Sequence, residues 1–175
     1  WIASTMSLSA AWKSIAYGNG KFVALDNVSG TNTLRTCTST DGVSWANQSA
    51  AITSTGTWAS ITFGNGKFVA VCSGGTAAAE STDGINWTAR TLPASKLWNS
   101  VCYGPLGFFA IPKDAANTAA AFSTDGTTWV PVVLPASVAW VACAYGFGRY
   151  GAVSVSTTTA ATSFNGIAWT SRTQQ

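Results

Sequence analysis

The sequence predicts an all-β protein built from tandem repeats, and its tryptophans are the first observation behind this prediction. The 175-residue chain contains nine of them, in two series. The first series comprises Trp12, Trp58, Trp98 and Trp140. The second comprises Trp1, Trp45, Trp87, Trp129 and Trp169. Within each series the residues recur at intervals of about 40 to 46 positions, and a fixed period of that order indicates a repeat architecture.

Turn signals are the second observation, because each repeat contains two of them. Asn19-Gly20 and Asn65-Gly66 lie between apolar runs, and Asn-Gly favours a two-residue hairpin in which both residues take positive φ. The second signal is Asp-Gly in the first three repeats and Asn-Gly in the fourth; these pairs begin at Asp41, Asp83, Asp125 and Asn165. Two hairpins make four short strands per repeat, and Val, Ile, Thr and aromatic residues dominate the segments between the turns.

Four strands recurring every forty-odd residues are typical of a β-propeller blade. We therefore expect one domain over residues 1–175, a small β-propeller of four blades with four antiparallel strands each. The repeats are placed at residues 12–45, 58–87, 98–129 and 140–169. Aromatic residues should fill the layers between blades; besides the tryptophans these are Phe22, Phe68, Phe109, Tyr17, Tyr103 and Tyr145.

Ring closure is left open by the sequence. Trp1 and Trp169 both occupy the last-strand position, so the segment around Trp1 is expected to take part in closing the ring. Two alternatives are a part of a larger propeller and an open β-solenoid.

The second turn of each repeat carries a longer motif. It reads Ser39-Thr-Asp41-Gly42-Val-Ser-Trp45 in the first repeat and recurs from Ser81 and Ser123, and less fully from Ser163. This pattern resembles the Asp-box (BNR-like) repeat of sialidase-like β-propellers, of the kind found in secreted bacterial and phage proteins. Here Asp and Gly are adjacent, whereas the usual Asp-box has one residue between them.

The resemblance implies a structural role for the turn residues Asp41, Asp83, Asp125 and Asn165, and a place outside the cell or on a virion surface. Elementary chemistry agrees, because an Asp side chain can accept hydrogen bonds from backbone N–H groups just after it. The sialidase active site is absent: the four arginines fall at non-equivalent repeat positions, and the Phe-Arg-Ile-Pro motif of that family is missing.

Composition excludes several function classes. Only 9% of residues are charged and the net charge is +3, and the chain has no Lys/Arg cluster for nucleic acid. The uncharged stretch from Gly126 to Gly148 contains two prolines and reads as strands, so no membrane insertion is predicted. The chain has no histidine, and we expect neither a metal nor a cofactor. Its four cysteines read as buried apolar residues, and a disulfide between Cys37 and Cys72 is left open.

Catalysis is not predicted. Glu80 is the most conspicuous acid, because it replaces the residues that stand at its position in the other repeats, but a glycoside hydrolase needs two carboxylates across one sugar ring. The candidate ligand-binding residues are those that vary between repeats, mostly in loops: Asp26, Asn27, Asn32, Glu80, Lys113, Asp114, Asn117, Phe147 and Arg149.

The prediction is therefore a non-catalytic propeller that recognises a glycan or cell-surface receptor, as a lectin-like or phage tail module. An assembly module that contacts other virion subunits is the alternative, and a glycoside hydrolase that uses Glu80 is the second.

Overall fold

The computed structural model describes the chain except for residues 1–4, 7–8, 28–32, 54–55, 156 and 174–175. The predictions on Trp1 and Asn32 therefore lie outside the described residues. The described part is all-β, as predicted, and none of its segments is a helix that could span a bilayer. The uncharged stretch between Gly126 and Gly148 forms strands, which confirms that part of the prediction.

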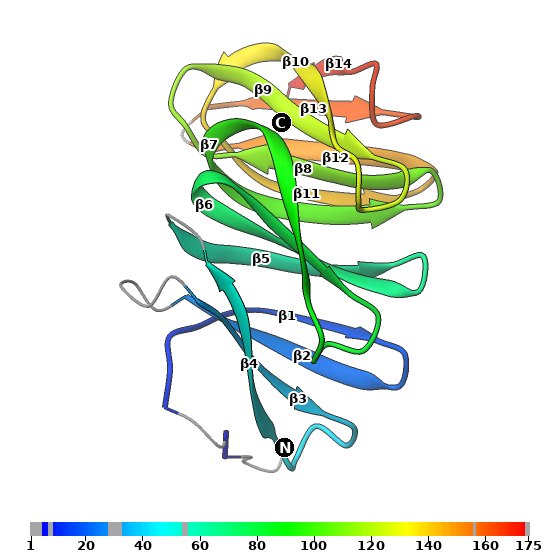
Figure 1. Ribbon diagram of the computed structural model, residues 1–175. Helices are drawn as coiled ribbons and strands as arrows, with labels where there is room; N and C mark the ends of the chain where they lie inside the picture. Colours follow the sequence, from blue (N-terminus) through cyan, green and yellow to red (C-terminus); the bar gives the residue numbers. More distant parts are fainter. Residues whose placement is uncertain (1–4, 7–8, 28–32, 54–55, 156, 174–175) are drawn as a thin grey trace.

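The strands form three antiparallel sheets stacked along the molecule (Figure 1). The first sheet contains β1 (Trp12–Gly18), β2 (Lys21–Asp26), β3 (Thr33–Ser39) and β4 (Ala46–Thr53). The middle sheet contains β5 (Thr57–Gly64), β6 (Lys67–Ser81), β7 (Thr88–Gly104), β8 (Gly107–Pro112), β9 (Asn117–Ser123) and β10 (Val130–Val138). The last contains β11 (Trp140–Gly146), β12 (Arg149–Ser154), β13 (Thr159–Ser163) and β14 (Thr170–Thr173).

This arrangement differs from the four separate four-stranded blades that the sequence predicts. The second and third repeats share one six-stranded sheet, because β6 and β7 are 15 and 17 residues long and continue through the predicted connections. The pairing of β6 with β7 shifts register between Ser73 and Ala77, and Figure 1 shows both ribbons bending back sharply. Backbone pairing of Ser73 with Leu97 and of Gly75 with Lys96 joins the two halves of the sheet.

The first hairpin of every repeat has the same construction. An aromatic pair faces across it, with ring centroids 4.7 to 5.0 Å apart: Tyr17–Phe22, Phe63–Phe68, Tyr103–Phe108 and Tyr145–Tyr150. The partner in the third repeat is Phe108, whereas Phe109 packs against Trp169 and fills the layer toward the fourth repeat, as predicted. At the tips, Asn19 and Asn65 have φ of 47° and their glycines about 75°, as expected for Asn-Gly hairpins.

The hydrophobic core consists of three clusters, each between two successive repeats. Leu25 and Leu34 pack with Trp58, Val71 and Leu92 pack with Trp98, and Ile111 and Leu134 pack with Trp140. The predicted use of tryptophan between layers therefore describes the buried Trp58, Trp98, Trp129 and Trp140. Trp12 and Trp45 are only half-buried, because they lie on the outer face of the first sheet.

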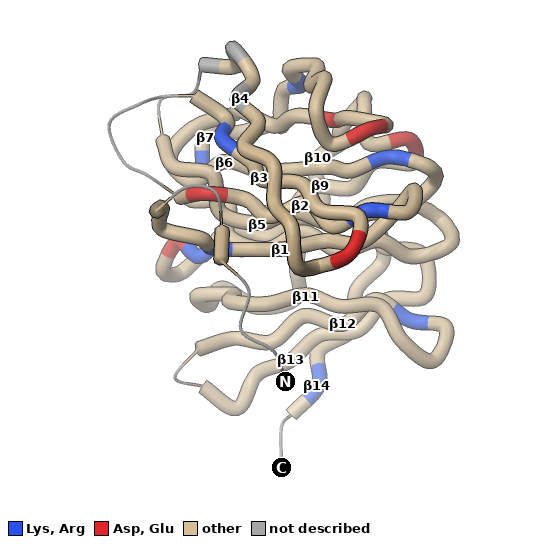
Figure 2. Tube along the Cα trace, turned by 90° about the horizontal axis from the view of Figure 1, so that it is seen from below, with Lys and Arg blue, Asp and Glu red and all other residues tan. Residues whose placement is uncertain are grey.

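Strand direction gives the stack two distinct ends. The hairpin tips, such as residues 19–20 and 147–148, and the Asp-containing turns, such as residues 40–45, lie at one end, which we call the turn end. The end of β2 at Asp26 and the β8–β9 connection lie at the other, the loop end. Figure 2 shows acidic and basic positions interspersed over the first and middle sheets, whereas the sheet of β11–β14 carries basic positions alone.

Candidate functional site

The turn end is held together by the Asp-containing turns. In the first repeat, Asp41 Oδ1 accepts the N–H groups of Val43 and Ser44 at 2.8 Å each, and the Ser39 hydroxyl donates to Asp41 and accepts from Gly42 N–H. These N–H groups of Ser44 and Val43 lower the pKa of Asp41 to about 2. One carboxylate oxygen of Asp41 therefore serves as the acceptor that organises the turn.

The same bonds recur in the other repeats. Asp83 accepts from Ile85 and Asn86, Asp125 from Thr127 and Thr128, and Asn165 from Ile167 and Ala168, all at 2.7 to 3.0 Å. These turns differ from the two-residue hairpins that the Asp-Gly signal predicts: only the glycine has positive φ, and strand pairing resumes at Thr38 and Ala46 in the first repeat. The side-chain acceptor supports a wider turn than the backbone alone would close.

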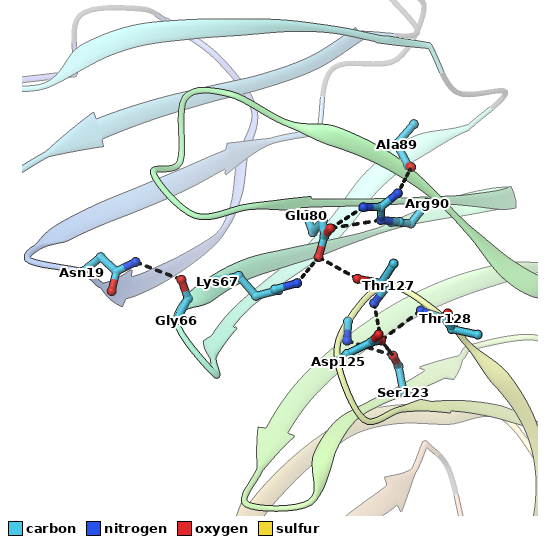
Figure 3. A network of polar contacts seen from close by, with 11 residues as sticks. Asn19, Gly66, Lys67, Glu80, Ala89, Arg90, Ser123, Asp125, Thr127 and Thr128 are labelled. Atoms are coloured by element: carbon cyan, nitrogen blue, oxygen red, sulfur yellow. Dashed lines mark hydrogen bonds and ion pairs between the residues drawn. The ribbon is translucent and has the colours of Figure 1, made fainter.

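Glu80 is the centre of a polar network between the second and third repeats (Figure 3). Its carboxylate pairs with Lys67 at 2.5 Å and with Arg90 at 2.5 and 3.1 Å, and Thr127 donates a hydrogen bond of 3.2 Å. Lys67 comes from the strand that carries Glu80 and Arg90 from its neighbour, and Thr127 comes from the next repeat. The network connects two Asp-containing turns.

The electrostatics of this network oppose acid catalysis. Burial raises the pKa of Glu80, but the hydrogen bonds and charges of Lys67 and Arg90 outweigh it, so the pKa lies below its ordinary value. Asp125, the other acid in Figure 3, also has a lowered pKa, because the N–H groups of Thr128 and Thr127 bind its ionised form. Both acids are ionised near neutral pH, whereas a glycosidase needs one protonated carboxyl.

Five of the predicted binding residues lie at the loop end. Asp26 is buried and pairs with Arg35 at 3.2 Å, and Asn27 follows it directly. Asp114 accepts the Leu97 N–H at 2.9 Å, and Asn117 is buried and accepts the Ala119 N–H at 3.1 Å. Lys113 is exposed. Most of these side chains are used within the protein itself, and the predicted set is divided between opposite ends of the molecule.

The tip of the fourth repeat brings together the other two predicted residues and one that the prediction missed. Phe147 is fully exposed at the β11–β12 hairpin. Arg149, at the start of β12, places its guanidinium carbon 4.1 Å from the centroid of the Phe164 ring, and Phe164 is itself exposed beside Asn165. We call Phe147, Arg149 and Phe164 the aromatic tip.

Phe147 has a backbone conformation that suits it poorly. Its φ is 49°, within 2° of the φ of Asn19 and Asn65 at the same hairpin position. Asparagine tolerates this left-handed region, whereas a bulky residue there costs about 1–2 kcal/mol. Backbone strain combined with full exposure of an aromatic ring is a feature of binding sites rather than of folding.

Phe164 could have been found from the sequence. It occupies the position of Thr40, Thr82 and Thr124 in the other three repeats, so it breaks the repeat as clearly as Phe147 does. Its relation to Arg149 could not have been found, because Arg149 begins β12 and Phe164 follows β13, and the two meet only through the fold.

Hollows also lie away from the aromatic tip, in the part of the chain that the structure describes. One of about 330 Å³ on the outer face of the first sheet is largely apolar and is lined by residues that include Trp12, Ile15 and Trp45. A polar one of about 230 Å³ borders Lys67 and Glu80. All four cysteines carry thiols, so Cys37 and Cys72 form no disulfide. The described residues contain no group of three acidic or cysteine side chains suited to a metal.

Comparison with known proteins identifies the fold. No family model and no curated protein matches the chain. Among solved structures, YCF48 bound to D1 peptide is 17% identical over 93% of this chain and 52% of its own, with a TM-score of 0.65. The catalytically inactive H270A virginiamycin B lyase of Staphylococcus aureus with quinupristin is 10% identical over 98% and 58%, with a TM-score of 0.78.

A chain of the nidogen/laminin complex is also similar, 10% identical over 86% of this chain and 58% of its own, with a TM-score of 0.62. This chain therefore spans little more than half the length of these solved structures. They are β-propeller-like, and at these identities the likeness concerns the fold alone. The chain has an all-β, propeller-like fold.

Proposed function

We propose that this chain is a non-catalytic recognition module that binds a glycan through the aromatic tip. One observation carries the proposal: Phe147 is a fully exposed aromatic residue in a left-handed backbone conformation, where two other repeats have asparagine. The exposed ring buries no apolar surface in the fold, whereas a ligand that packs against it would gain an apolar contact.

The chemistry of the tip suits a sugar. The faces of aromatic rings carry negative charge, and the C–H groups of a sugar ring can pack against them. Arg149 covers one face of Phe164, and the in-plane N–H groups of a guanidinium are donors for hydroxyl or carboxylate oxygens. A rigid platform with a few polar donors is the usual composition of a small-molecule site.

The proposal also includes the four-blade count and the extracellular or virion setting that the sequence predicts. The six-stranded sheet represents two blades joined through β6 and β7, so that the four repeats are four blades of four strands. The register shifts around Gly75 support this division, as do the three equivalent core clusters. The setting is extracellular or on a virion, as a lectin-like module or a receptor-binding part of a phage tail; the Asp-box resemblance supports it.

A glycan array probed with the labelled 175-residue chain tests the proposal. We expect binding to a subset of glycans, and a loss of at least 10-fold in affinity for Phe147→Asn, which corresponds to about 1.4 kcal/mol. Because asparagine suits this backbone, the variant should melt at the same temperature as the natural chain or higher.

Leu106→Asn is the matched control, since Leu106 is an exposed apolar residue at the tip of the third repeat. It should leave glycan binding unchanged. Wild-type affinity in Phe147→Asn would refute the site. Binding to a peptide array and to no glycan would refute the ligand class.

A further inference from the structure

Inside the chain, one kind of contact joins each repeat to the next. An aromatic side chain of the later repeat lies on a glycine of the earlier one, so closely that an added β-carbon at the glycine would stand 1.9 to 2.5 Å from the ring. The three pairs are Phe63 on Gly18, Tyr103 on Gly64 and Tyr145 on Gly104.

Tyr17 in the first repeat and Gly146 in the last hold the same positions, but no neighbouring repeat covers them. Tyr17 is 58% exposed, and its ring is already held against Phe22 at 4.7 Å, as in the internal pairs. A β-carbon at Gly146 would meet nothing within 4 Å. The outer face of the first sheet therefore presents the aromatic residue of this contact, and the outer face of the last sheet presents its glycine.

The apolar residues around these two positions show the same division. Ile15 is 55% exposed, whereas its equivalents Ile61 and Val101 are 5% exposed. Val153 is 40% exposed, whereas its equivalents Leu25, Val71 and Ile111 are fully buried. The hollow of about 330 Å³ beside Trp12 and Trp45 lies on the first of these faces. At the first internal contact, Leu25 and Leu34 of the preceding repeat pack against the equivalent Trp58.

The two faces of one chain point away from each other. In Figure 1 the sheet of β1–β4 and the sheet of β11–β14 lie at opposite ends of the stack. In Figure 2 their first strands β1 and β11 lie toward the middle, and their last strands β4 and β14 extend to opposite sides. The stack is thus an open arc, and the outer face of its first sheet is complementary to the outer face of its last sheet.

We propose that a second copy of this chain occupies both faces, so that Tyr17 of each copy lies on Gly146 of the other. Lys13 is the only charged residue among those lining the hollow, so the first face offers the contact a largely apolar surface. Head-to-tail contacts form a ring when the rotation closes. Two copies also supply about the length of the propeller-like chains described above, which are nearly twice as long as this one. This inference is independent of the glycan proposal.

One hydrogen bond of the internal contact is missing at the proposed joint. The hydroxyls of Ser14, Ser60 and Ser100 accept the N–H groups of Ile61, Val101 and Cys143, at 3.2 Å in each case. The next residue in this series is Ala142, which offers no acceptor. The joint between copies is therefore weaker than the joints within the chain, which makes it reversible.

Sedimentation velocity over a concentration series tests the inference with the 175-residue chain. We expect a monomer–dimer equilibrium in the natural protein. Gly146→Leu fills an open position and should weaken the dimer at least 10-fold without changing the melting temperature, and Tyr17→Ala should weaken it similarly. Mixing the two variants should restore association in part, because one joint then has an intact Tyr17 and an intact Gly146. Ala142→Ser should tighten the dimer by about 25-fold, because each of its two joints gains one hydrogen bond of about 1 kcal/mol.

A natural chain that is monomeric up to 100 µM (about 2 mg/ml) would overturn the inference, whether its ends close on themselves or take another partner. Dimerisation that neither Gly146→Leu nor Tyr17→Ala weakens would overturn it as well. The glycan array and the sedimentation series are separate measurements, so a failure of the glycan proposal is visible separately from a failure of this one.

Discussion

The ring of Tyr145 lies on Gly104 so closely that a β-carbon at the glycine would stand 2.5 Å from it. Tyr150, which pairs with Tyr145, would be 2.7 Å away. The close contact between the third and fourth repeats therefore depends on the absence of a side chain at Gly104. Gly146 has the same position in its own repeat, and there the space is open.

Gly104→Ala should therefore destabilise the protein, while Gly146→Ala should not. Crowding a packed layer costs about 1–3 kcal/mol, whereas Gly→Ala at an open position with ordinary φ gains about 0.4–1 kcal/mol. Urea unfolding of the two variants measures the difference. Equal free energies of unfolding would show that the glycine at this position is not a contact between repeats.

Asn165→Asp should stabilise the fourth turn at neutral pH by about 0.5–1 kcal/mol, because a charged acceptor binds the same N–H groups more strongly. The gain should depend on pH. Asp41, in the equivalent turn, has a pKa of about 2 in the folded protein against an ordinary value of 3.8. A carboxyl with a lowered pKa stabilises the fold above its ordinary pKa, and this stability is lost as the pH falls from about 4 toward 2. Thermal melts of the variant and the natural chain at pH 7 and pH 2.5 check both statements; an advantage that is as large at pH 2.5 as at pH 7 would contradict them.

Glu80→Gln should destabilise the joint between the second and third repeats by about 1–2 kcal/mol, since it weakens the charge-assisted bonds of Lys67 and Arg90. Because the pKa of Glu80 is lowered from its ordinary value of 4.5, the loss should be present at neutral pH and should shrink as the pH falls below that ordinary value and the carboxyl protonates. Chemical unfolding at pH 7 and pH 3 measures it. Glycan binding should be unchanged; its loss in a folded variant would return Glu80 to the list of ligand-binding residues.

Tyr150→Phe should cost about 1 kcal/mol, because the buried hydroxyl donates to Gly107 O at 2.9 Å and so ties β12 to the third repeat. Burial raises the pKa of Tyr150 to about 12. A raised pKa means stability that is present below pH 10 and is lost as the pH rises toward 12. The difference in the free energy of unfolding between the natural chain and Tyr150→Phe should therefore be smaller at pH 11 than at pH 8. An equal difference at both pH values would show that this hydroxyl titrates normally.

Local features of this fold were predictable from the sequence, because they are set by a few neighbouring residues. Asn19-Gly20 gives a left-handed hairpin tip, and the Asp41 side chain organises its own turn. The six-stranded sheet was not predictable, since it depends on whether backbone pairing continues between Ser73 and Leu97. No residue preference decides this.

The candidate site divides in the same way. Phe147 and Arg149 stand out in the sequence because they break the repeat, whereas the pairing of Arg149 with Phe164 depends on the fold. Asn117 also varies between repeats, but the structure buries it in a local turn. Variation between repeats identifies departures from the pattern and does not tell a ligand contact from a local structural role.

The most direct test of the proposed function is a titration of the 15N-labelled chain with the glycan that gives the strongest array signal, followed by amide chemical shifts. The proposal predicts the largest shifts at residues 146–149 and 163–166, around the aromatic tip. Shifts concentrated at the loop end, around Asp26 and residues 113–117, would contradict it.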